Sequence, residues 1–321
     1  RINGGTSDAA ATAYWEWGNV TVNVINPTAV AEIGGRIRMR VDNTASTYTV
    51  ADGISANDLL LSAALTEING AATFTKAGAG TMTLTGANSF TGAVTVNAGT
   101  LAVTNATGLG TSAGGVTVAN GAILDLQNIA VGAEATTLNG GTLLVSTGTS
   151  SLGGTVALGA NSAVNVAGTQ LTISGAISGA NFGYTKSGAG DLILTASNTY
   201  TGPTTISAGT LIFQNDAPSL TSSSFTGPGS LIVKPNGTSF TNAYTFDESL
   251  STVTKLSALT LGKSGNAANI TVSSAANVAG PITVYGGNIV ISNVLNTTGA
   301  TGSSGLVSLY ASDSIKVSSN I

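Results

Sequence analysis

One stretch of this chain occurs twice. The first copy runs from Phe74 to Leu101 (FTKAGAGTMTLTGANSFTGAVTVNAGTL) and the second from Tyr184 to Leu211 (YTKSGAGDLILTASNTYTGPTTISAGTL), and the two align without a gap. More than half of the aligned residues are identical, and most of the others are exchanges of like kind. An internal repeat of this sort is typical of proteins built from stacked units, each of which covers the core of the next. It therefore restricts the chain to a repeat architecture.

Within each copy, short alternating segments lie between glycines. Thr81 to Thr85 (TMTLT) is typical of a strand in which every second side chain points the same way. The glycines suit corners that need a positive φ or a close backbone approach, and we expect positive φ at Gly92 and Gly202. The Asn of each copy is expected to bond backbone groups at a corner, the alternative being an exposed turn residue. The predicted corner residues are Gly78, Gly80, Asn88, Gly92 and Gly99 in the first copy, and Gly188, Gly190, Asn198, Gly202 and Gly209 in the second.

The pattern TK-GAG-L-L-GAN-YTG-T-V-AGTL resembles the autotransporter-associated β-strand repeat, found in the secreted passenger regions of bacterial type V secretion proteins. Both copies match along their length, and together they cover about a sixth of the chain. The resemblance implies an all-β fold, a right-handed parallel β-helix (β-solenoid) forming an elongated rod. It also implies export across both membranes of a Gram-negative cell and display at the surface. It implies no catalytic residue, because the repeat is scaffold.

Composition supports the same fold class independently. Only 7% of the residues are charged, against roughly 25% in ordinary globular proteins, and 43 of 321 are glycine. A solenoid can expose Thr, Ser and Asn on its strand faces and stack a thin apolar core one rung at a time, a rung being one turn of the coil. The longest apolar runs, such as Leu59 to Leu61, are far shorter than the roughly 20 residues of a membrane helix. We therefore expect no transmembrane segment.

The absence of Cys and His excludes much of enzyme chemistry. Without them the chain lacks thiolate nucleophiles, the commonest general base and the usual zinc ligands. The net charge of −4 argues against nucleic acid as a partner. Beyond Gly70 the acidic residues are scattered, and the two side chains of the pair Asp247 and Glu248 would face opposite sides of a strand. We therefore predict no catalytic, cofactor or metal site, with a carbohydrate-active β-helix as a remote alternative.

The N-terminal segment up to Gly70 holds both tryptophans and all four arginines. Trp15 and Trp17 would share one face of a strand, either as a cap or subunit contact at the end of the core or as a platform for sugar rings. The stripe Arg36, Arg38 and Arg40 is expected to pair with nearby carboxylates such as Asp42, or else to contact an acidic glycan or neighbouring chain. At the other end, alternation continues to the last residue, which suggests an open edge. The cap or contact candidates are Tyr14, Trp15, Trp17, Arg36, Arg38, Arg40, Ile315, Val317 and Ile321.

Four segments are predicted. Residues 1–70 form the atypical N-terminal segment, and residues 71–213 a solenoid with rungs of about 22 residues that holds both repeat copies. Residues 214–265 contain clustered prolines and glycines and are expected to form an irregular junction or loop. Residues 266–321 are expected to add uncapped rungs, and their IVIS and IKVS segments resemble the filamentous-haemagglutinin type of β-helix repeat. The chain has no initiator Met or signal segment and ends inside a repeat, so we expect a mature form or a fragment.

The functional prediction is a non-enzymatic extracellular structural protein of a Gram-negative bacterium. Its expected partner is itself, in a fibre of copies joined head to tail, with the C-terminal rungs continued either by more polypeptide or by a neighbouring copy. The alternative is an adhesin stalk that displays loops, such as the segment from Phe225 to Phe240, to surface glycans or other cells. No cofactor is expected.

Overall fold

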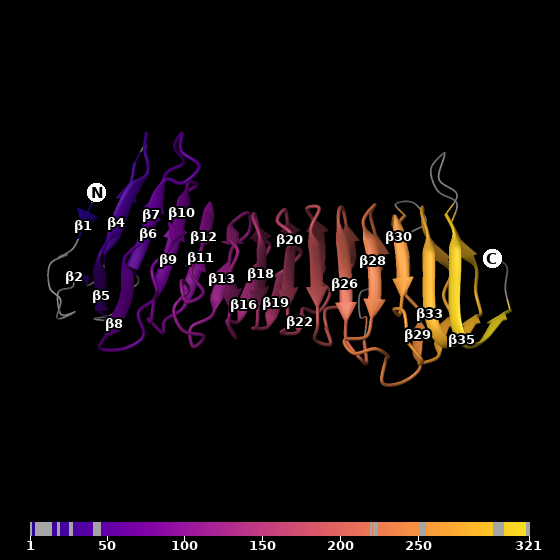
Figure 1. The fold of residues 1–321 in the computed structure, drawn as a ribbon. Helices are drawn as coiled ribbons and strands as arrows, with labels where there is room; N and C mark the ends of the chain where they lie inside the picture. Colours follow the sequence, from indigo (N-terminus) through magenta and orange to yellow (C-terminus); the bar gives the residue numbers. More distant parts are fainter. Residues whose placement is uncertain are drawn as a thin grey trace. The chain divides into compact units, whose positions relative to one another are not determined.

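The computed structural model describes residues 2–3, 15–17, 20–25, 28–40, 46–218, 220, 224–248, 250, 255–297 and 305–318. The chain divides into two compact units, Arg1–Ser162 (unit 1) and Ala163–Ile321 (unit 2). In the described ranges every named element is a β-strand, and the pairings within each unit are parallel. Each unit is a stack of rungs (Figure 1). The predicted class, an all-β parallel solenoid, is confirmed, and the chain makes about 13 turns.

Within unit 1 the strands follow four paths of neighbours. Two paths are long, β1-β4-β7-β10-β12-β14-β17 and β3-β6-β9-β11-β13-β16-β19, and two are short, β2-β5-β8 and β15-β18. The strands are β1 (Ile2–Asn3), β2 (Trp15–Trp17), β3 (Thr21–Val24), β4 (Ala31–Gly34), β5 (Arg36–Arg40), β6 (Ser46–Val50), β7 (Leu59–Leu61), β8 (Ala64–Ile68), β9 (Phe74–Ala77), β10 (Thr81–Leu84), β11 (Val94–Val96), β12 (Thr100–Val103), β13 (Val116–Val118), β14 (Ile123–Leu126), β15 (Ala130–Val131), β16 (Thr136–Asn139), β17 (Thr142–Val145), β18 (Thr149–Leu152) and β19 (Val156–Ala160). The strand β20 (Ser162–Val166) begins at the last residue of this unit.

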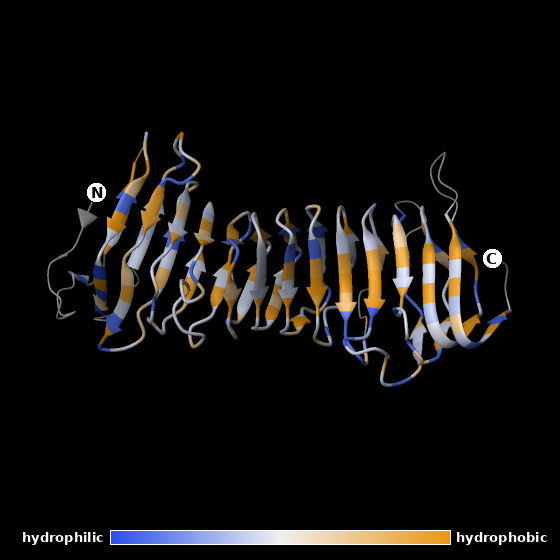
Figure 2. Cartoon of the chain, viewed as in Figure 1, coloured by the Kyte–Doolittle hydropathy of each residue, from blue (hydrophilic) through white to orange (hydrophobic). Residues whose placement is uncertain are grey.

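Unit 2 contains the sheet path β21-β24-β26-β28-β30-β33, the path β23-β25-β27, and the pairs of β33 with β31 and β35. The strands are β21 (Gln170–Ile173), β22 (Ile177–Ser178), β23 (Tyr184–Ser187), β24 (Asp191–Leu194), β25 (Thr204–Ile206), β26 (Thr210–Gln214), β27 (Phe225–Thr226), β28 (Ser230–Lys234), β29 (Tyr244–Phe246), β30 (Ala258–Leu261), β31 (Ile270–Val272), β32 (Ala276–Asn277), β33 (Ile282–Ile291), β34 (Leu295–Asn296) and β35 (Val307–Val317). Figure 2 shows hydropathy alternating along β33, whose buried and half-exposed residues also alternate over most of its length.

The core of unit 1 is a set of inward columns, each supplied by one residue per rung. In one column Leu59, Met82, Leu101, Leu124 and Leu143 stand in register, and each is fully buried. The column takes four steps from Leu59 to Leu143, so a rung averages about 21 residues. This value is close to the predicted one, because each rung needs the same number of inward positions while its corners vary.

The strands that precede the first repeat copy join this column system. Strand β6 pairs with β9 in the first repeat copy, and β7 pairs with β10. Tyr48 and Val50 of β6 are fully buried. The segment predicted to be atypical therefore contains strands that stack in the same manner as those of the repeat.

The segment 214–265 is more regular than the irregular junction predicted from its prolines. Strand β28 pairs with β26 before it and β30 after it, residue for residue. The extra length is in one rung, because the step from Leu231 to its register partner Leu259 is longer than the step from Leu211 to Leu231. The prolines lie outside the strands, at corners where a missing N–H removes no ladder hydrogen bond; they are Pro218, Pro228 and Pro235.

In the ranges described above, no helix is long and apolar enough to cross a membrane.

Candidate functional site

Each repeat copy contains a lysine whose side chain is completely buried. Lys76 follows Phe74 at the inward phase of β9, so alternation directs both side chains into the core. Its Nζ donates hydrogen bonds to the carbonyl oxygens of Ala77 (3.0 Å), Gly78 (2.8 Å) and Ala98 (3.0 Å). The ammonium thereby joins corners of two successive rungs.

Lys186 repeats this arrangement in unit 2. Its Nζ donates to the carbonyl oxygens of Ser187 (3.0 Å), Gly188 (2.8 Å) and Ala208 (3.0 Å). Burial lowers the pKa of both lysines to about 8, against an opposing effect of Asp58 on Lys76 and of Asp191 on Lys186. The sequence analysis missed these residues, although a Lys in the inward phase of both copies was a readable signal.

The asparagines of the repeat bond backbone groups inside the stack. Asn88 accepts a hydrogen bond from the backbone N–H of Leu65 (2.8 Å) and donates one to the carbonyl of Gly108 (2.6 Å). Asn198 accepts from the backbone N–H of Ile177 (2.8 Å). Asn266, which the sequence analysis missed, does the same, accepting from Phe240 N–H. Both predicted asparagines thus bond backbone groups of neighbouring rungs.

The glycines of the repeat act through two different constraints. Positive φ is found at Gly78 and Gly99, and at their partners Gly188 and Gly209 in the second copy. Gly92 and Gly202 do not belong to this group, so the positive φ expected for them was wrong. A Cβ on Gly92 would lie 2.1 Å from the carbonyl oxygen of Ala72, and one on Gly202 would lie 2.2 Å from the carbonyl carbon of Phe182. Close backbone approach, rather than φ, requires glycine there.

A Cβ on Gly80 or Gly190 would also meet backbone of the preceding rung, at 2.3 Å and 2.2 Å. All the glycines predicted at corners are therefore constrained by φ or by backbone approach.

The tryptophans lie on the strand β2 at the start of unit 1. Trp15 and Trp17 are in register with Ile37 and Met39, which are buried. The Trp17 ring lies 6.5 Å from the ring of Tyr48, whereas Trp15 is 45% exposed. Trp17 thus packs on its own chain, as a cap would.

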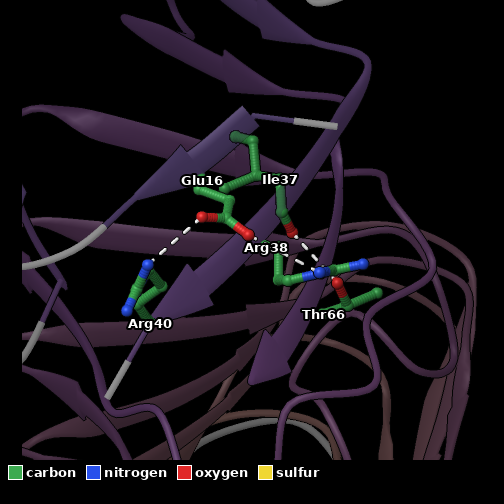
Figure 3. A network of polar contacts seen from close by, with 5 residues as sticks. All are labelled: Glu16, Ile37, Arg38, Arg40 and Thr66. Atoms are coloured by element: carbon green, nitrogen blue, oxygen red, sulfur yellow. Dashed lines mark hydrogen bonds and ion pairs between the residues drawn. The ribbon is translucent and has the colours of Figure 1, made fainter. Parts of the chain in front are cut away.

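Two arginines of the β5 stripe, Arg38 and Arg40, share the carboxylate of Glu16. Figure 3 shows Glu16 between Arg38 and Arg40, at 3.5 Å and 3.4 Å. In the same view, the Thr66 hydroxyl donates to the carbonyl of Ile37 (3.4 Å). Because the ion pairs are partly exposed to solvent, they contribute little to stability, about 0–1 kcal/mol each. Glu16 is a described partner of Arg38 and Arg40, and the expected partner Asp42 lies outside the described residues.

The remaining contact candidates are at the other end of the chain. Ile315 and Val317 of β35 are exposed, at 47% and 42%. Tyr14 and Ile321 lie outside the described residues.

One hollow in unit 1 combines several polar groups. Its volume is about 280 Å³, and residues of three stretches line it: Asn88, Ser89, Ala106, Thr107, Leu109, Gly110, Thr111, Ser112, Val131, Gly132, Ala133 and Glu134. Glu134 is 4% exposed, and its Oε1 is buried without a hydrogen-bond partner. Burial raises the pKa of Glu134 to about 7, against the opposing effect of a hydrogen bond from the Gly115 N–H. The sequence analysis treated this residue as one of the scattered carboxylates.

In the described part of the chain, no group of three or more His, Cys, Asp or Glu residues could hold a metal ion. Burial, and next the charge of Asp247, raises the pKa of Glu248 to about 7. Asp216 accepts a hydrogen bond from the Gly237 N–H (2.9 Å) and so closes a corner. No arrangement of paired acid and base emerges from these positions.

The comparisons with known proteins agree with the repeat pattern. The passenger-associated-transport-repeat family matches residues 74–103 and 185–213. The chain is 30% identical over 189 residues to the adhesin BmaC autotransporter of Brucella suis biovar 1 (strain 1330). That alignment covers 59% of this chain and 5% of the adhesin, so the chain spans a small part of its relative's length. No solved structure matches the chain. The resemblance read from the sequence is confirmed: the chain carries two passenger-associated transport repeats of the autotransporter type.

Proposed function

We propose that this chain is part of a non-enzymatic, adhesin-type autotransporter passenger displayed at the surface of a Gram-negative bacterium. The observation that carries the proposal is the similarity to an autotransporter adhesin over 189 residues, together with the two repeat copies. The fold is compatible with this role, because a parallel solenoid holds corners and loops on a scaffold of paired strands. The scattered carboxylates and the lack of His and Cys add support for a binding role over catalysis.

The corners near the prolines are the best candidates for display. Phe225 and Phe240 are buried, so the displayed part of that segment is its corners rather than its strands. Asp216, Pro218 and Asn242 border a hollow of about 220 Å³ beside Phe240. Such a corner presents polar groups around an apolar floor, as binding loops commonly do.

Attachment of coated beads tests the proposal. Beads carrying the purified chain are expected to bind to cultured animal cells in larger numbers than beads carrying the same chain after heat unfolding. Equal numbers on the two kinds of bead would contradict an adhesin role. Release of sugars from the cell surface by the soluble chain would contradict its non-enzymatic part.

The head-to-tail fibre remains a separate proposal. The exposed residues of β35 do not favour the fibre over a longer polypeptide. Either a further rung of the same polypeptide or a second copy could cover that strand. Light scattering at increasing protein concentration tests it: growing particles support the fibre, and a constant monomer mass contradicts it.

A further inference from the structure

We propose that a hollow beside two stacked tyrosines of unit 2 binds one ring of a neutral sugar. The hollow has a volume of about 270 Å³. It is lined by residues 264–267 of a corner, residues 285–286 of β33 and residues 310–312 of β35. The inference deepens the proposed function by naming a ligand class, and it rests on that function only for the source of the sugar.

The hollow is present because one corner is longer than the matching part of the next rung. Residues 262–269 join β30 to β31. The two strands pair with successive parts of β33, and between those parts β33 has only residues 285–288. Strands β33 and β35 continue past this point as long neighbouring strands (Figure 1). Part of the longer corner, residues 264–267, therefore forms a wall of the hollow beside them.

The wall is held in place by the side chain of Asn266, which is 4% exposed. This side chain accepts a hydrogen bond from the backbone N–H of Phe240 (3.1 Å) and donates one to the carbonyl of Tyr285 (2.7 Å). Small residues of the two long strands, Gly286 and Ala311, line the hollow next to the wall and leave its space open. The site is thus formed before a ligand arrives, which lowers the entropy cost of binding.

Two tyrosine rings supply the aromatic part of the lining. Tyr285 follows the buried Val284 in the alternation of β33, so its side chain is on the outer face of the strand. Its ring is stacked on the ring of Tyr310, with centroids 4.8 Å apart and an angle of 12° between the planes. Tyr310 is 56% exposed, so a ligand in the hollow can reach its ring. The exposed ring offers a surface on which the C–H groups of a ligand can pack.

The polar part of the lining consists of hydroxyl groups. Ser264 and Ser312 are exposed, and the two tyrosines add their phenol groups. A hydroxyl group can both donate and accept a hydrogen bond. Among the described residues that line the hollow, none is Asp, Glu, Lys or Arg. The lining therefore favours a neutral ligand that has several donors and acceptors of its own.

A pyranose ring meets these requirements in one molecule. It has faces of C–H groups, which can pack on a tyrosine ring, and a rim of hydroxyls, which can bond to the serines and phenols. An ammonium compound could use the aromatic rings, but it would leave the hydroxyls without partners and would find no carboxylate in the described lining. Ligand pockets usually enclose about 300–1,000 Å³, so a hollow of about 270 Å³ has room for a single ring.

The test is binding of free sugars to the purified full chain. The methyl glycosides of glucose, galactose and mannose, together with N-acetylglucosamine, are titrated by saturation-transfer NMR, with tetramethylammonium as a separate probe. We expect at least one sugar to bind, and its affinity to fall about 10-fold or more in Tyr310→Ala, which removes the exposed ring. Ser312→Ala should also weaken binding, by about 3-fold or more. Trp15→Ala is the matched control, because it removes an exposed aromatic ring of unit 1 and should leave the affinity unchanged.

Several outcomes would overturn the proposal. These are no binding of any of the four sugars, an unchanged affinity in Tyr310→Ala, an equal fall in affinity in Trp15→Ala, and tighter binding of tetramethylammonium than of every sugar. Circular dichroism checks that each variant is folded, and Ser312→Ala decides if Tyr310→Ala is not. Sugar binding without attachment of beads to cells would leave this inference standing and contradict the adhesin role. Attachment without sugar binding would do the reverse.

Discussion

Replacing Lys76 with Met should lower the stability of unit 1 by about 3 kcal/mol. Met has nearly the length of Lys and fills the same inward position, but it donates no hydrogen bond. The carbonyl oxygens of Ala77, Gly78 and Ala98 would each lose a donor at 2.8–3.0 Å. A buried polar atom left unpaired costs about 1–3 kcal/mol. The three unpaired oxygens together cost several times this amount at most. Removing the buried ammonium also removes its desolvation cost of several kcal/mol, which leaves a net loss of about 3 kcal/mol.

Thermal unfolding at pH 7, followed by circular dichroism, measures the change. At that pH the lysine is mainly charged, since its pKa is about 8. For a unit of about this size, 3 kcal/mol corresponds to a fall in melting temperature of roughly 6–12 °C. Lys186→Met should produce a similar fall in unit 2, because its three bonds have the same lengths.

The control is Lys316→Met, at an exposed position of β35, which should change stability by less than about 0.5 kcal/mol. If Lys76→Met and Lys186→Met melt at the temperature of the unchanged protein, the ammonium bonds do no more than balance the cost of burying the charge. The role given to the two lysines would then be refuted.

Three further changes test other parts of the stack. Asn88→Ala should cost about 2–4 kcal/mol, measured by urea unfolding, since it leaves a buried N–H and a buried carbonyl unpaired; a loss below about 1 kcal/mol would contradict this. Gly92→Ala should lower stability by about 3 kcal/mol, because the new Cβ would lie 2.1 Å from a backbone oxygen. Gly132→Ala is its control: the new Cβ would meet nothing within 4 Å, so the melting temperature should not change. Glu248→Gln should raise the melting temperature at pH 8 and change it little at pH 5. The folded pKa of Glu248, about 7, lies above its unfolded value, so its destabilising charge develops as pH rises between roughly 4.5 and 7; the gain should be about 1–2 kcal/mol, and equal gains at both pH values would contradict the assignment.

The fold could be predicted because the solenoid is determined by local periodicity. Alternation in segments such as Thr81 to Leu84 fixes which side chains face inward, and the repeated glycines mark the corners. The same rule places Lys76 inside, since it shares the inward phase of one strand with Phe74. The sequence analysis did not place Lys76 in the core, because a charged residue is normally assigned to the surface. One of the carbonyls that accept its hydrogen bonds, that of Ala98, also lies on the next rung.

Features that depend on stacking were harder to predict. The prolines of residues 214–265 suggested an irregular junction, yet all of them fall at corners between paired strands. Gly92 was assigned to the wrong constraint, because its closest neighbour is the backbone of Ala72, which is distant in sequence. The pairing of Arg40 with Glu16 was not predicted for the same reason, since the two residues lie on different rungs. Contacts between rungs depend on how the strands of successive rungs align, and this alignment cannot be read from the sequence alone.

Buried polar groups that recur in both repeat copies are bonded differently from one that does not recur. Lys76 and Asn88 recur in the second copy, and in both copies their polar atoms are bonded within the stack, as expected of groups that hold a scaffold together. Glu134 has no such counterpart, because the residue at the equivalent distance after the second copy is Tyr244. A buried carboxylate oxygen without a partner weakens the fold, so stability alone gives no reason for this residue. The repeat therefore accounts for the buried polar groups that hold successive rungs together, and it does not account for Glu134.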